Sequence, residues 1–373
     1  MNIKNIKSLR EIYSRQLESE NLPRELKIII DGVEYRYKRM DLEDETLKLR
    51  YGLNPHQSSA IYKPEDDMGF SKIRLLKTGK GGLSSNNIND GYNAMRITSY
   101  FKDKRAVSII KHLNPAGVAI GELNTNGGWI VEEAWSVDPR ASYGCVMGLN
   151  FKVDFETAEA IVKQDKYVEC IFAPEYSEEA LEILSKKRSL RVIEVPIPKV
   201  QDPIQEHKIP LNIRVIGNTI ILEEHFKTKL TSIEKLRELD EKPETGVVTN
   251  RRPTPKEEEW MLYAWWICAE KSSNGVVLWR ENKTIAVACG QQDRIGAIEI
   301  AIEKAKRNNH KTMGSILASD GFMLPDNIPP LVEAGVTAII QPGGSIHDEQ
   351  IIEECNKHDI AMIFTGERIF RHF

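Results

Sequence analysis

The sequence has few cysteines, and their spacing matches no known framework. Among its 373 residues no Cys-x-x-Cys pair occurs, and the five cysteines are widely separated: Cys145, Cys170, Cys268, Cys289 and Cys355. An odd, scattered set favours reduced thiols over a disulfide scaffold. The eight histidines also lack His-x-x-x-His spacing. Because zinc sites use closely spaced ligands of these kinds, we expect no zinc site and no metal in the chemistry.

Long apolar runs and an excess of basic charge are missing too. No run approaches the length of a membrane span, and Met1–Lys7 lacks the apolar core of a signal peptide. The formal net charge of −4 disfavours non-specific binding to nucleic acid or to anionic membranes. It leaves room for a local basic pocket that binds a phosphorylated small molecule. We therefore expect a soluble, cytoplasmic protein with small-molecule partners.

Strands and helices are expected to alternate over residues 72–196 and again from residue 246. This alternation predicts an α/β fold of two units, each with a mostly parallel sheet covered on both faces. The expected strands are 72–76, 106–110, 143–147, 168–173, 190–195, 276–279, 284–288, 315–319, 336–341 and 361–365. The expected helices are 84–101, 130–135, 155–162, 177–184, 260–267 and 295–305.

The segments outside these two units have different patterns. Ser8–Glu18 is expected to be a polar helix, and Asp31-Gly32 between two β-prone runs predicts a hairpin. A segment that is first proline-rich and later charged separates the units. The predicted organisation is an N-terminal appendage, a first unit, a crossover segment and a second unit, at residues 1–48, 49–200, 201–245 and 246–373.

The stretch Lys111–Gly117 is the strongest candidate for chemistry. It follows an apolar run expected to be a buried strand, and we expect Asn114-Pro115 to break the backbone and Gly117 to permit a sharp turn. Lys111 and His112 would then lie at a strand end, where open α/β sheets hold ligands. In a partly dry pocket they supply a fixed cation and a group that moves protons near neutral pH. Taken alone, a surface lysine beside a core histidine is the commoner explanation.

Several loops suit a phosphate ligand, although none matches a known fingerprint. Gly79–Gly82 and Pro342–Ser345 are glycine-rich, but neither is a P-loop or a dinucleotide motif. Arg50 and Arg368 are stronger candidates, because a guanidinium matches an oxyanion bidentately. They lie at opposite ends of the chain, so the fold or an oligomer has to bring them together.

An ordered series of motifs over about residues 49–373 resembles the aminoimidazole carboxamide ribonucleotide (AICAR) formyltransferase domain of the bifunctional purine biosynthesis enzymes. The motifs are Arg50-Tyr51-Gly52-x-Asn54-Pro55-His56-Gln57, Ser85-Asn86-Asn87-Ile88, Lys111-His112-x-Asn114-Pro115-x-Gly117, Asp138-Pro139, Ser142-Tyr143-Gly144, Val247-Val248-Thr249, Lys271-Ser272-Ser273-Asn274, Gly290-Gln291-Gln292-x-Arg294, Ala318-Ser319-Asp320, Gln341-Pro342-Gly343-Gly344-Ser345 and Arg368-x-Phe370-x-His372.

The resemblance implies formyl transfer from 10-formyltetrahydrofolate, as co-substrate, to the 5-amino group of AICAR. It also implies two zinc-less, cytidine-deaminase-like α/β/α units and a homodimer with its active sites at the interface. The implied catalytic residues are Lys111, His112, Asn274 and His372. The implied nucleotide-binding residues are Arg50, Tyr51, Asn87, Gly144, Glu169 and Arg368. The implied folate-binding residues are Gln292, Arg294, Ile295, Phe322 and Pro342.

Two departures from the family pattern leave alternatives open. The bifunctional members carry a cyclohydrolase domain ahead of this one, whereas only 48 residues precede Leu49, so we expect a separate protein to close the ring. The stretch Gly321–Asn327 is shorter than in the family and has one aromatic residue, so a different formyl donor is an alternative. A non-catalytic nucleotide-binding homologue is another, although it has little use for a base. A deaminase of similar fold would need zinc motifs that are absent.

Overall fold

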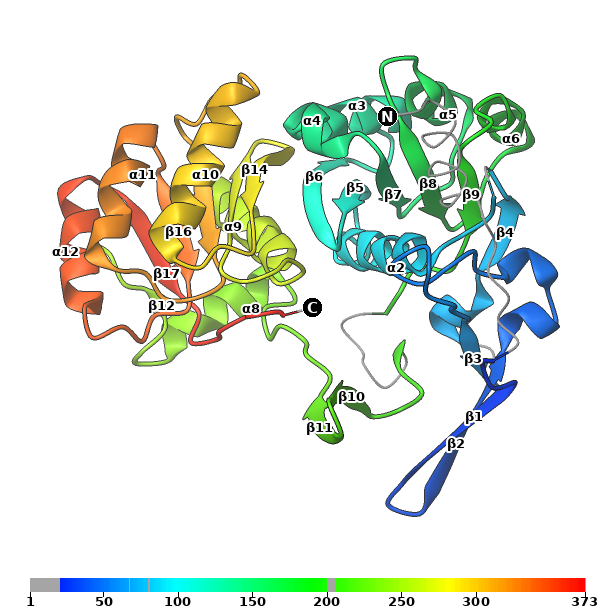
Figure 1. The fold of residues 1–373 in the computed structure, drawn as a ribbon. Helices are drawn as coiled ribbons and strands as arrows, with labels where there is room; N and C mark the ends of the chain where they lie inside the picture. Colours follow the sequence, from blue (N-terminus) through cyan, green and yellow to red (C-terminus); the bar gives the residue numbers. More distant parts are fainter. Residues whose placement is uncertain (1–20, 67, 80, 200–205, 373) are drawn as a thin grey trace, which may run out of the picture. The chain divides into compact units, whose positions relative to one another are not determined.

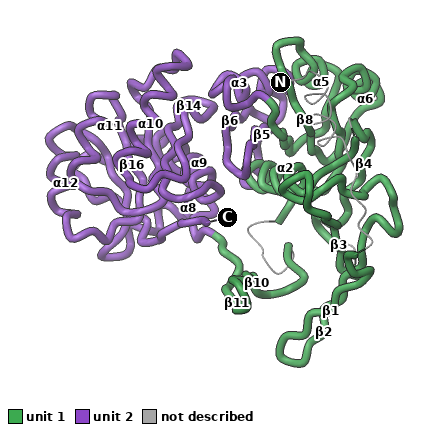
Figure 2. Tube along the Cα trace, in the orientation of Figure 1, with its two compact units in different colours: residues 1–99, 144–227 green, residues 100–143, 228–373 purple. Residues whose placement is uncertain are grey.

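The structure is a computed structural model that describes residues 21–66, 68–79, 81–199 and 206–372 (Figure 1). The chain separates into two compact units, which Figure 2 colours differently. Unit 1 consists of Met1–Ser99 and Gly144–Lys227, and unit 2 of Tyr100–Tyr143 and Thr228–Phe373. Each unit thus draws on two separate stretches, whereas the predicted domains are contiguous; those domain boundaries stay a prediction. The helix predicted for Ser8–Glu18 lies outside the described residues.

Unit 1 contains a four-stranded portion of sheet in the order β7-β8-β9-β4. Strands β7, β8 and β9 are parallel, as predicted, and β4 is antiparallel to β9. Its elements are β1 (Glu25–Ile30), β2 (Val33–Arg39), η1 (Met40–Leu42), η2 (Glu45–Leu47), β3 (Tyr62–Pro64), η3 (Gly69–Lys72), β4 (Arg74–Lys77), α2 (Ser85–Ser99), β7 (Cys145–Leu149), α5 (Phe155–Val162), β8 (Val168–Ala173), α6 (Glu178–Ser185), β9 (Arg191–Glu194), β10 (Leu211–Ile216) and β11 (Thr219–Glu224).

The N-terminal hairpin predicted at Asp31-Gly32 is confirmed. Strands β1 and β2 pair in antiparallel register, from Ile30 opposite Val33 to Glu25 opposite Lys38. Asp31 and Gly32 both have positive φ, 49° and 79°, which is the geometry that a two-residue hairpin loop requires. The turn residues thus have the conformation that the sequence predicted, and β2 also pairs with β3 in a three-stranded sheet.

Unit 2 contains strands in the order β12-β17-β16-β15-β13-β14-β6-β5. Its elements are β5 (Arg105–Lys111), β6 (Asn114–Gly121), α3 (Gly127–Val137), α4 (Pro139–Ser142), α8 (Ile233–Arg237), η4 (Glu238–Glu241), β12 (Gly246–Val247), α9 (Pro255–Cys268), β13 (Val276–Arg280), β14 (Lys283–Ala288), α10 (Arg294–Arg307), β15 (Ile316–Ser319), η5 (Pro325–Asn327), α11 (Ile328–Ala334), β16 (Ala338–Gln341), α12 (Asp348–Lys357) and β17 (Ala361–Phe364).

The sheet of unit 2 is mixed, so the prediction of a mostly parallel sheet is wrong there. Among the described strands of unit 2, only β15, β16 and β17 run parallel to one another. The pairs β5–β6 and β13–β14 are antiparallel, because each is joined by a two-residue loop, and a parallel connection needs about a dozen residues or more. The molecule is therefore a mixed α/β protein.

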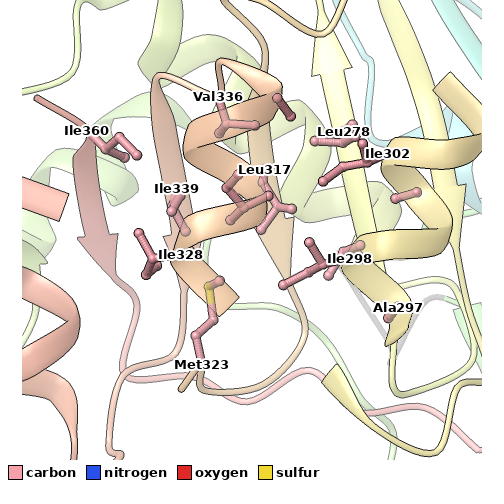
Figure 3. Packing of buried hydrophobic residues seen from close by; sticks show 14 of the residues in the cluster. Leu278, Ala297, Ile298, Ile302, Leu317, Met323, Ile328, Val336, Ile339 and Ile360 are labelled. Atoms are coloured by element: carbon pink, nitrogen blue, oxygen red, sulfur yellow. The ribbon is translucent and has the colours of Figure 1, made fainter. Parts of the chain in front are cut away.

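Helices cover both faces of the β13–β17 part of this sheet. On one face, Ile298 and Ile302 of α10 pack with Leu278, Leu317 and Ile339 of the strands (Figure 3). On the other face, α9 packs on β13, β15 and β16. Because helices cover both faces, the side chains of β13 are buried on both sides, and its sequence is a nearly continuous run of apolar residues. In the part of the chain that the structure describes, no helix combines the length and the apolarity needed to cross a membrane.

Candidate active site

The Lys111-His112 pair lies at a hairpin turn in unit 2. Lys111 ends β5 and pairs with Asn114, the first residue of β6, so His112 and Leu113 form a two-residue loop. Their φ angles are 54° and 65°, the positive values that such a loop demands. The prediction that Asn114-Pro115 breaks the strand and that Gly117 makes the turn is therefore wrong. No Asn-Gly or Asp-Gly signal marks this hairpin in the sequence.

Pro115 and Gly117 have other structural roles within β6. Pro115 lies opposite Ile110, where the β5–β6 register shifts, and an irregular position tolerates a residue without an N–H. A Cβ atom built on Gly117 would lie 2.2 Å from the backbone oxygen of Ala134 in α3. Gly117 is thus required for the close approach of the helix to the strand.

Asn114 connects the His112 turn to the Lys271–Asn274 segment. Its Nδ2 donates to the backbone oxygen of His112 at 3.0 Å, and its Oδ1 accepts from the backbone N–H of Ser272 at 2.8 Å. Lys111 is half-buried, and its Nζ donates to the backbone oxygen of Tyr143. His112 is exposed in this chain, and it lines a cavity together with Lys111. Two segments that are far apart in the sequence thus meet at one turn.

The same segment continues the hydrogen-bonded path to Asn274 and to the C-terminal tail. The N–H of Ser273 donates to the oxygen of Arg371 at 3.0 Å, and Ser273 Oγ accepts from the N–H of Arg371 at 3.2 Å. Asn274 exchanges backbone hydrogen bonds with Gln291. His372 follows Arg371 in the chain, and Lys111 precedes His112. The hydrogen bonds described above therefore link the segments of unit 2 that carry all four predicted catalytic residues.

The side-chain amide of Asn274 is held in one orientation. Arg294 Nη2 donates to Asn274 Oδ1 at 2.9 Å, and Asn274 Nδ2 donates to the oxygen of Gln292 at 3.2 Å. Among the bonds described, the amide oxygen accepts from the guanidinium and one N–H donates to Gln292, so the second N–H hydrogen of Asn274 is available to a ligand. Arg294 is buried, with both terminal nitrogens bonded inward, although it is expected to be a folate-binding residue.

Asp320 is the fully buried centre of this network. Its carboxylate accepts hydrogen bonds from Ser273 Oγ at 2.8 Å, from the N–H of Gly275 at 3.1 Å, and from the side chains of Lys271 and Arg294. Lys271 and Asp320 have no solvent-exposed surface. A buried carboxylate needs this many partners, and removal of one partner of such a pair typically costs about 3–5 kcal/mol. Sequence reasoning assigned no role to Lys271 or Asp320, although both belong to quoted motifs.

The C-terminal tail brings further predicted residues to unit 2. The guanidinium of Arg368 lies 4.6 Å from the ring centre of Phe370, whose ring is 6.1 Å from that of His372. Arg368 and His372 are exposed, and Phe322 is 47% exposed. Pro342 is buried, and its oxygen accepts from the N–H of Gly366. Ile295, half-buried, follows Arg294 in α10.

The remaining predicted residues form a second group, in unit 1. Arg50 lies 4.9 Å from the ring centre of its neighbour Tyr51. Asn87 at the start of α2 accepts from the N–H of Ser84 and donates to Glu169 Oε2 at 3.3 Å. Gly144, with φ of 77°, donates to the oxygen of Tyr167. The expected nucleotide-binding residues other than Arg368 thus belong to one unit.

Arg191 is an additional cation in the unit 1 group. Arg50 and Arg191 are 7% and 3% exposed, and Arg191 donates to the oxygen of Gly82 in the glycine-rich loop. Burial, and secondly the charge of Arg191, lowers the pKa of Arg50, while Tyr51 and Glu169 oppose the shift. Two buried guanidinium groups near one carboxylate favour an anionic ligand. Nothing in the sequence pattern singled out Arg191.

Metal-ligating groups do not cluster in the described residues. No three His, Cys, Asp or Glu side chains among them are arranged to hold a metal ion. The cysteines at positions 145, 170, 268, 289 and 355 are all free thiols.

The sequence is similar to those of bifunctional purine biosynthesis proteins PurH from several bacteria. It is 38% identical to the protein from Anoxybacillus flavithermus and 36% identical to that from Aquifex aeolicus, in each case over 87% of this chain and 59% of the relative. The protein from Leptospira biflexa is 34% identical over 91% of this chain and 62% of the relative. The chain thus spans about three fifths of the length of these curated relatives.

A solved structure with a weaker likeness is the apo form of the dCMP deaminase from the cyanophage S-TIM5. It is 15% identical, with a TM-score of 0.23, and the match covers 30% of this chain and 98% of the deaminase. A similarity of this size does not establish a shared fold, so the deaminase-like fold stays a prediction.

The family comparison agrees with the motifs that unit 2 assembles. The sequence profile described as "AICARFT/IMPCHase bienzyme" matches residues 17–304, which include the Lys111 turn, Asn274 and Arg294. The chain therefore belongs to the AICARFT/IMPCHase bienzyme family.

Proposed function

We propose that this protein is an AICAR formyltransferase that transfers the formyl group of 10-formyltetrahydrofolate to the 5-amino group of AICAR in purine biosynthesis. The observation that carries the proposal is the hydrogen-bonded path in unit 2, from the His112 turn through Asn114 to Ser272–Asn274 and Arg371. Membership of the bienzyme family supports it.

The proposed reaction needs a base, because the lone pair of the AICAR amine is delocalised into the ring. His112 takes a proton from this amine as the nitrogen attacks the formyl carbon, and a new N–C bond forms. The bond from the formyl carbon to N10 of the folate then breaks, and N10 accepts a proton. Lys111 supplies the cation beside the developing oxyanion, or the proton for N10. His372 orients His112.

Asn274 is proposed to donate a hydrogen bond from Nδ2 to the formyl oxygen. The contacts that support this role are those of its amide, whose oxygen is engaged by Arg294 and whose NH₂ keeps one hydrogen for a ligand. Arg294, Asp320 and Lys271 are then positioning residues. Fixed donors of this kind stabilise an oxyanion because they need no reorganisation during the reaction.

The two substrates are proposed to use different residue sets. Arg50, Tyr51, Asn87, Gly144, Glu169 and Arg368 bind the nucleotide, with the arginines on its phosphate. Gln292, Ile295, Phe322 and Pro342 line the folate side, while Arg294 acts there through Asn274. The exposed ring of Phe322 is suited to stack against a pterin.

The proposal extends to fold and assembly. The two halves are proposed to be zinc-less, cytidine-deaminase-like units of a cytoplasmic homodimer with its active sites at the interface.

The first test is mass spectrometry of purified protein mixed with AICAR and 10-formyltetrahydrofolate. We expect an enzyme-dependent mass increase on the nucleotide equal to one formyl group in place of one hydrogen. Nucleotide binding without this product would indicate another formyl donor, and absence of AICAR binding would overturn the proposal.

A His112→Ala substitution tests the proposed base. Loss of a general base typically lowers turnover about 10²–10⁴-fold, and we expect kcat to fall by that amount. The matched control is His358→Ala, since His358 is exposed at the end of α12 and pairs only with Glu354 on the same helix among the bonds described. Full turnover by His112→Ala would exclude the assigned mechanism.

A further inference from the structure

Unit 2 contains a cavity of about 410 Å³ beside the proposed base, and its charged lining is predominantly basic. Four of its lining side chains are cationic and one is acidic: Lys111, Arg140, Lys304, Arg307 and Asp138. The whole chain, in contrast, has a formal net charge of −4. A local excess of positive charge in a concave site concentrates anions.

The single carboxylate does not neutralise these cations. Asp138 Oδ2 lies 3.3 Å from Lys304 Nζ and 3.4 Å from Arg307 Nη2, both longer than the about 2.7–2.9 Å of a strong charged hydrogen bond. Its Oδ1 accepts from the N–H of Ala141 in α4. Lys111 and Lys304 also donate to the neutral backbone oxygens of Tyr143 and Val287. Positive charge therefore remains for a ligand.

The rest of the lining is apolar and adjoins the proposed chemistry. Pro115, Ala116, Ala141 and Cys289 contribute apolar surface, and His112 lies on the wall. A cavity of this size holds a fragment of a small molecule, with apolar walls for its body and charged groups for its ends. The ligand that fits is amphipathic, with one or more oxyanions at one end.

We propose that this cavity binds the carboxylates of the glutamyl tail of the formyl-folate donor through Lys304, Arg307 and Arg140. This inference rests on the proposed function. An oxyanion is the shared chemistry, and the phosphate of the nucleotide is its other source. Two observations favour the carboxylates: unit 1 already offers the buried Arg50 and Arg191 for a compact phosphate, and the cavity cations are spread over α4 and α10. Spread cations suit separated carboxylates joined by methylene groups.

The test compares the wild-type protein with Lys304→Gln and Arg140→Gln. The matched control is Lys306→Gln, because Lys306 is exposed on the same helix and does not line the cavity. Steady-state KM is measured for AICAR, for 10-formyltetrahydrofolate with one or five glutamates, and for the analogue that lacks glutamate. Isothermal titration with tetrahydrofolate pentaglutamate gives a readout that does not depend on turnover.

We expect each cavity variant to raise KM and Kd for the glutamylated folates about tenfold, since a charged hydrogen bond is lost. The same variants should leave KM for the glutamate-free analogue and for AICAR unchanged, and Lys306→Gln should match the wild type. Unchanged Kd for the pentaglutamate would overturn the proposal. A rise in KM for AICAR alone would assign the cavity to the phosphate and overturn the tail assignment.

These readouts separate the two proposals. If the wild-type protein transfers no formyl group but binds the pentaglutamate in a Lys304-dependent manner, the proposed reaction fails and the cavity assignment survives. Arg140 is exposed on α4, so Arg140→Gln keeps the test valid if Lys304→Gln disturbs folding through Asp138.

Discussion

At the scale of single residues, the direction of the Asn274 amide determines which contact this side chain offers to a ligand. Arg294 bonds to the amide oxygen and to Asp320, so the orientation of Asn274 depends on a carboxylate 46 positions further along the chain. An asparagine free to flip would offer donor and acceptor alternately, and its contribution to oxyanion stabilisation would be reduced.

We expect Asn274→Ala to lower kcat about 10²–10³-fold, because loss of one oxyanion donor has that effect.

Arg294→Lys keeps the charge beside Asp320 and loses the forked geometry that also reaches Asn274, so we expect a smaller fall, about tenfold, with KM for AICAR unchanged. Steady-state kinetics at saturating folate measure both effects. Wild-type turnover in Arg294→Lys would show that Arg294 does not position Asn274.

At the scale of elements, Glu257 joins the start of α9 to the beginning of β16. Its carboxylate accepts from both Nη atoms of Arg251 at 2.9 Å, from the N–H of Thr254 at 2.8 Å and from Thr337 Oγ1 at 2.7 Å. Burial raises the pKa of Glu257, but the bonds from Arg251, Thr254 and Thr337 outweigh it and lower the pKa to about 2. One side chain thus caps a helix and ties it to the sheet.

Because the folded-state pKa is below the ordinary value of 4.5, ionised Glu257 stabilises the protein above about pH 4.5. This contribution, on the order of 3 kcal/mol, is lost as pH falls from about 4.5 towards 2. We expect Glu257→Gln to lower the free energy of unfolding at pH 7, with a difference from the wild type that shrinks below pH 4.5. Urea unfolding across this range measures it. The control is Glu259→Gln, an exposed position on the same helix; an equal loss there would contradict the assignment.

At the scale of the whole molecule, the predicted site residues are divided between the two units. The proposed chemistry uses residues of unit 2, whereas Arg50, Asn87 and Glu169 belong to unit 1. The dimer is proposed because of the family resemblance, and it raises the question of whether one chain or two complete a site.

Mixing two inactive variants answers this question. If Arg50 of one subunit and His112 of the other share a site, co-refolded Arg50→Ala and His112→Ala should regain activity, because a heterodimer contains one intact site. The expected gain is up to about a quarter of the wild-type activity, since half of the dimers are mixed and each has one working site. Sedimentation equilibrium measures the dimer itself. A monomer, or no recovery in a proven heterodimer, would contradict the shared site.

Local signals in the sequence predicted much of the secondary structure. The hairpin at Asp31-Gly32, the strand Val168–Ala173 and the helix Arg294–Arg307 lie where turn residues and apolar periodicity indicated. These features depend on neighbours a few residues away, so the sequence carries them directly. The motifs likewise led to the family and to the residues on the unit 2 path.

Only the tertiary structure decided the direction of the strands and the connections within the site. The hairpin at His112 depends on two residues held at positive φ without a glycine, and the surrounding sheet imposes that geometry. Gly117 is required because the backbone of a helix approaches it closely. Asp320 can be buried because four donors from distant segments bond to its carboxylate. Such roles follow from contacts between residues far apart in the chain, where burial makes each polar group dependent on its partners. The sequence by itself therefore determined the local elements and the family, because these depend on neighbouring residues and on motifs, and the fold decided which distant residues contact one another.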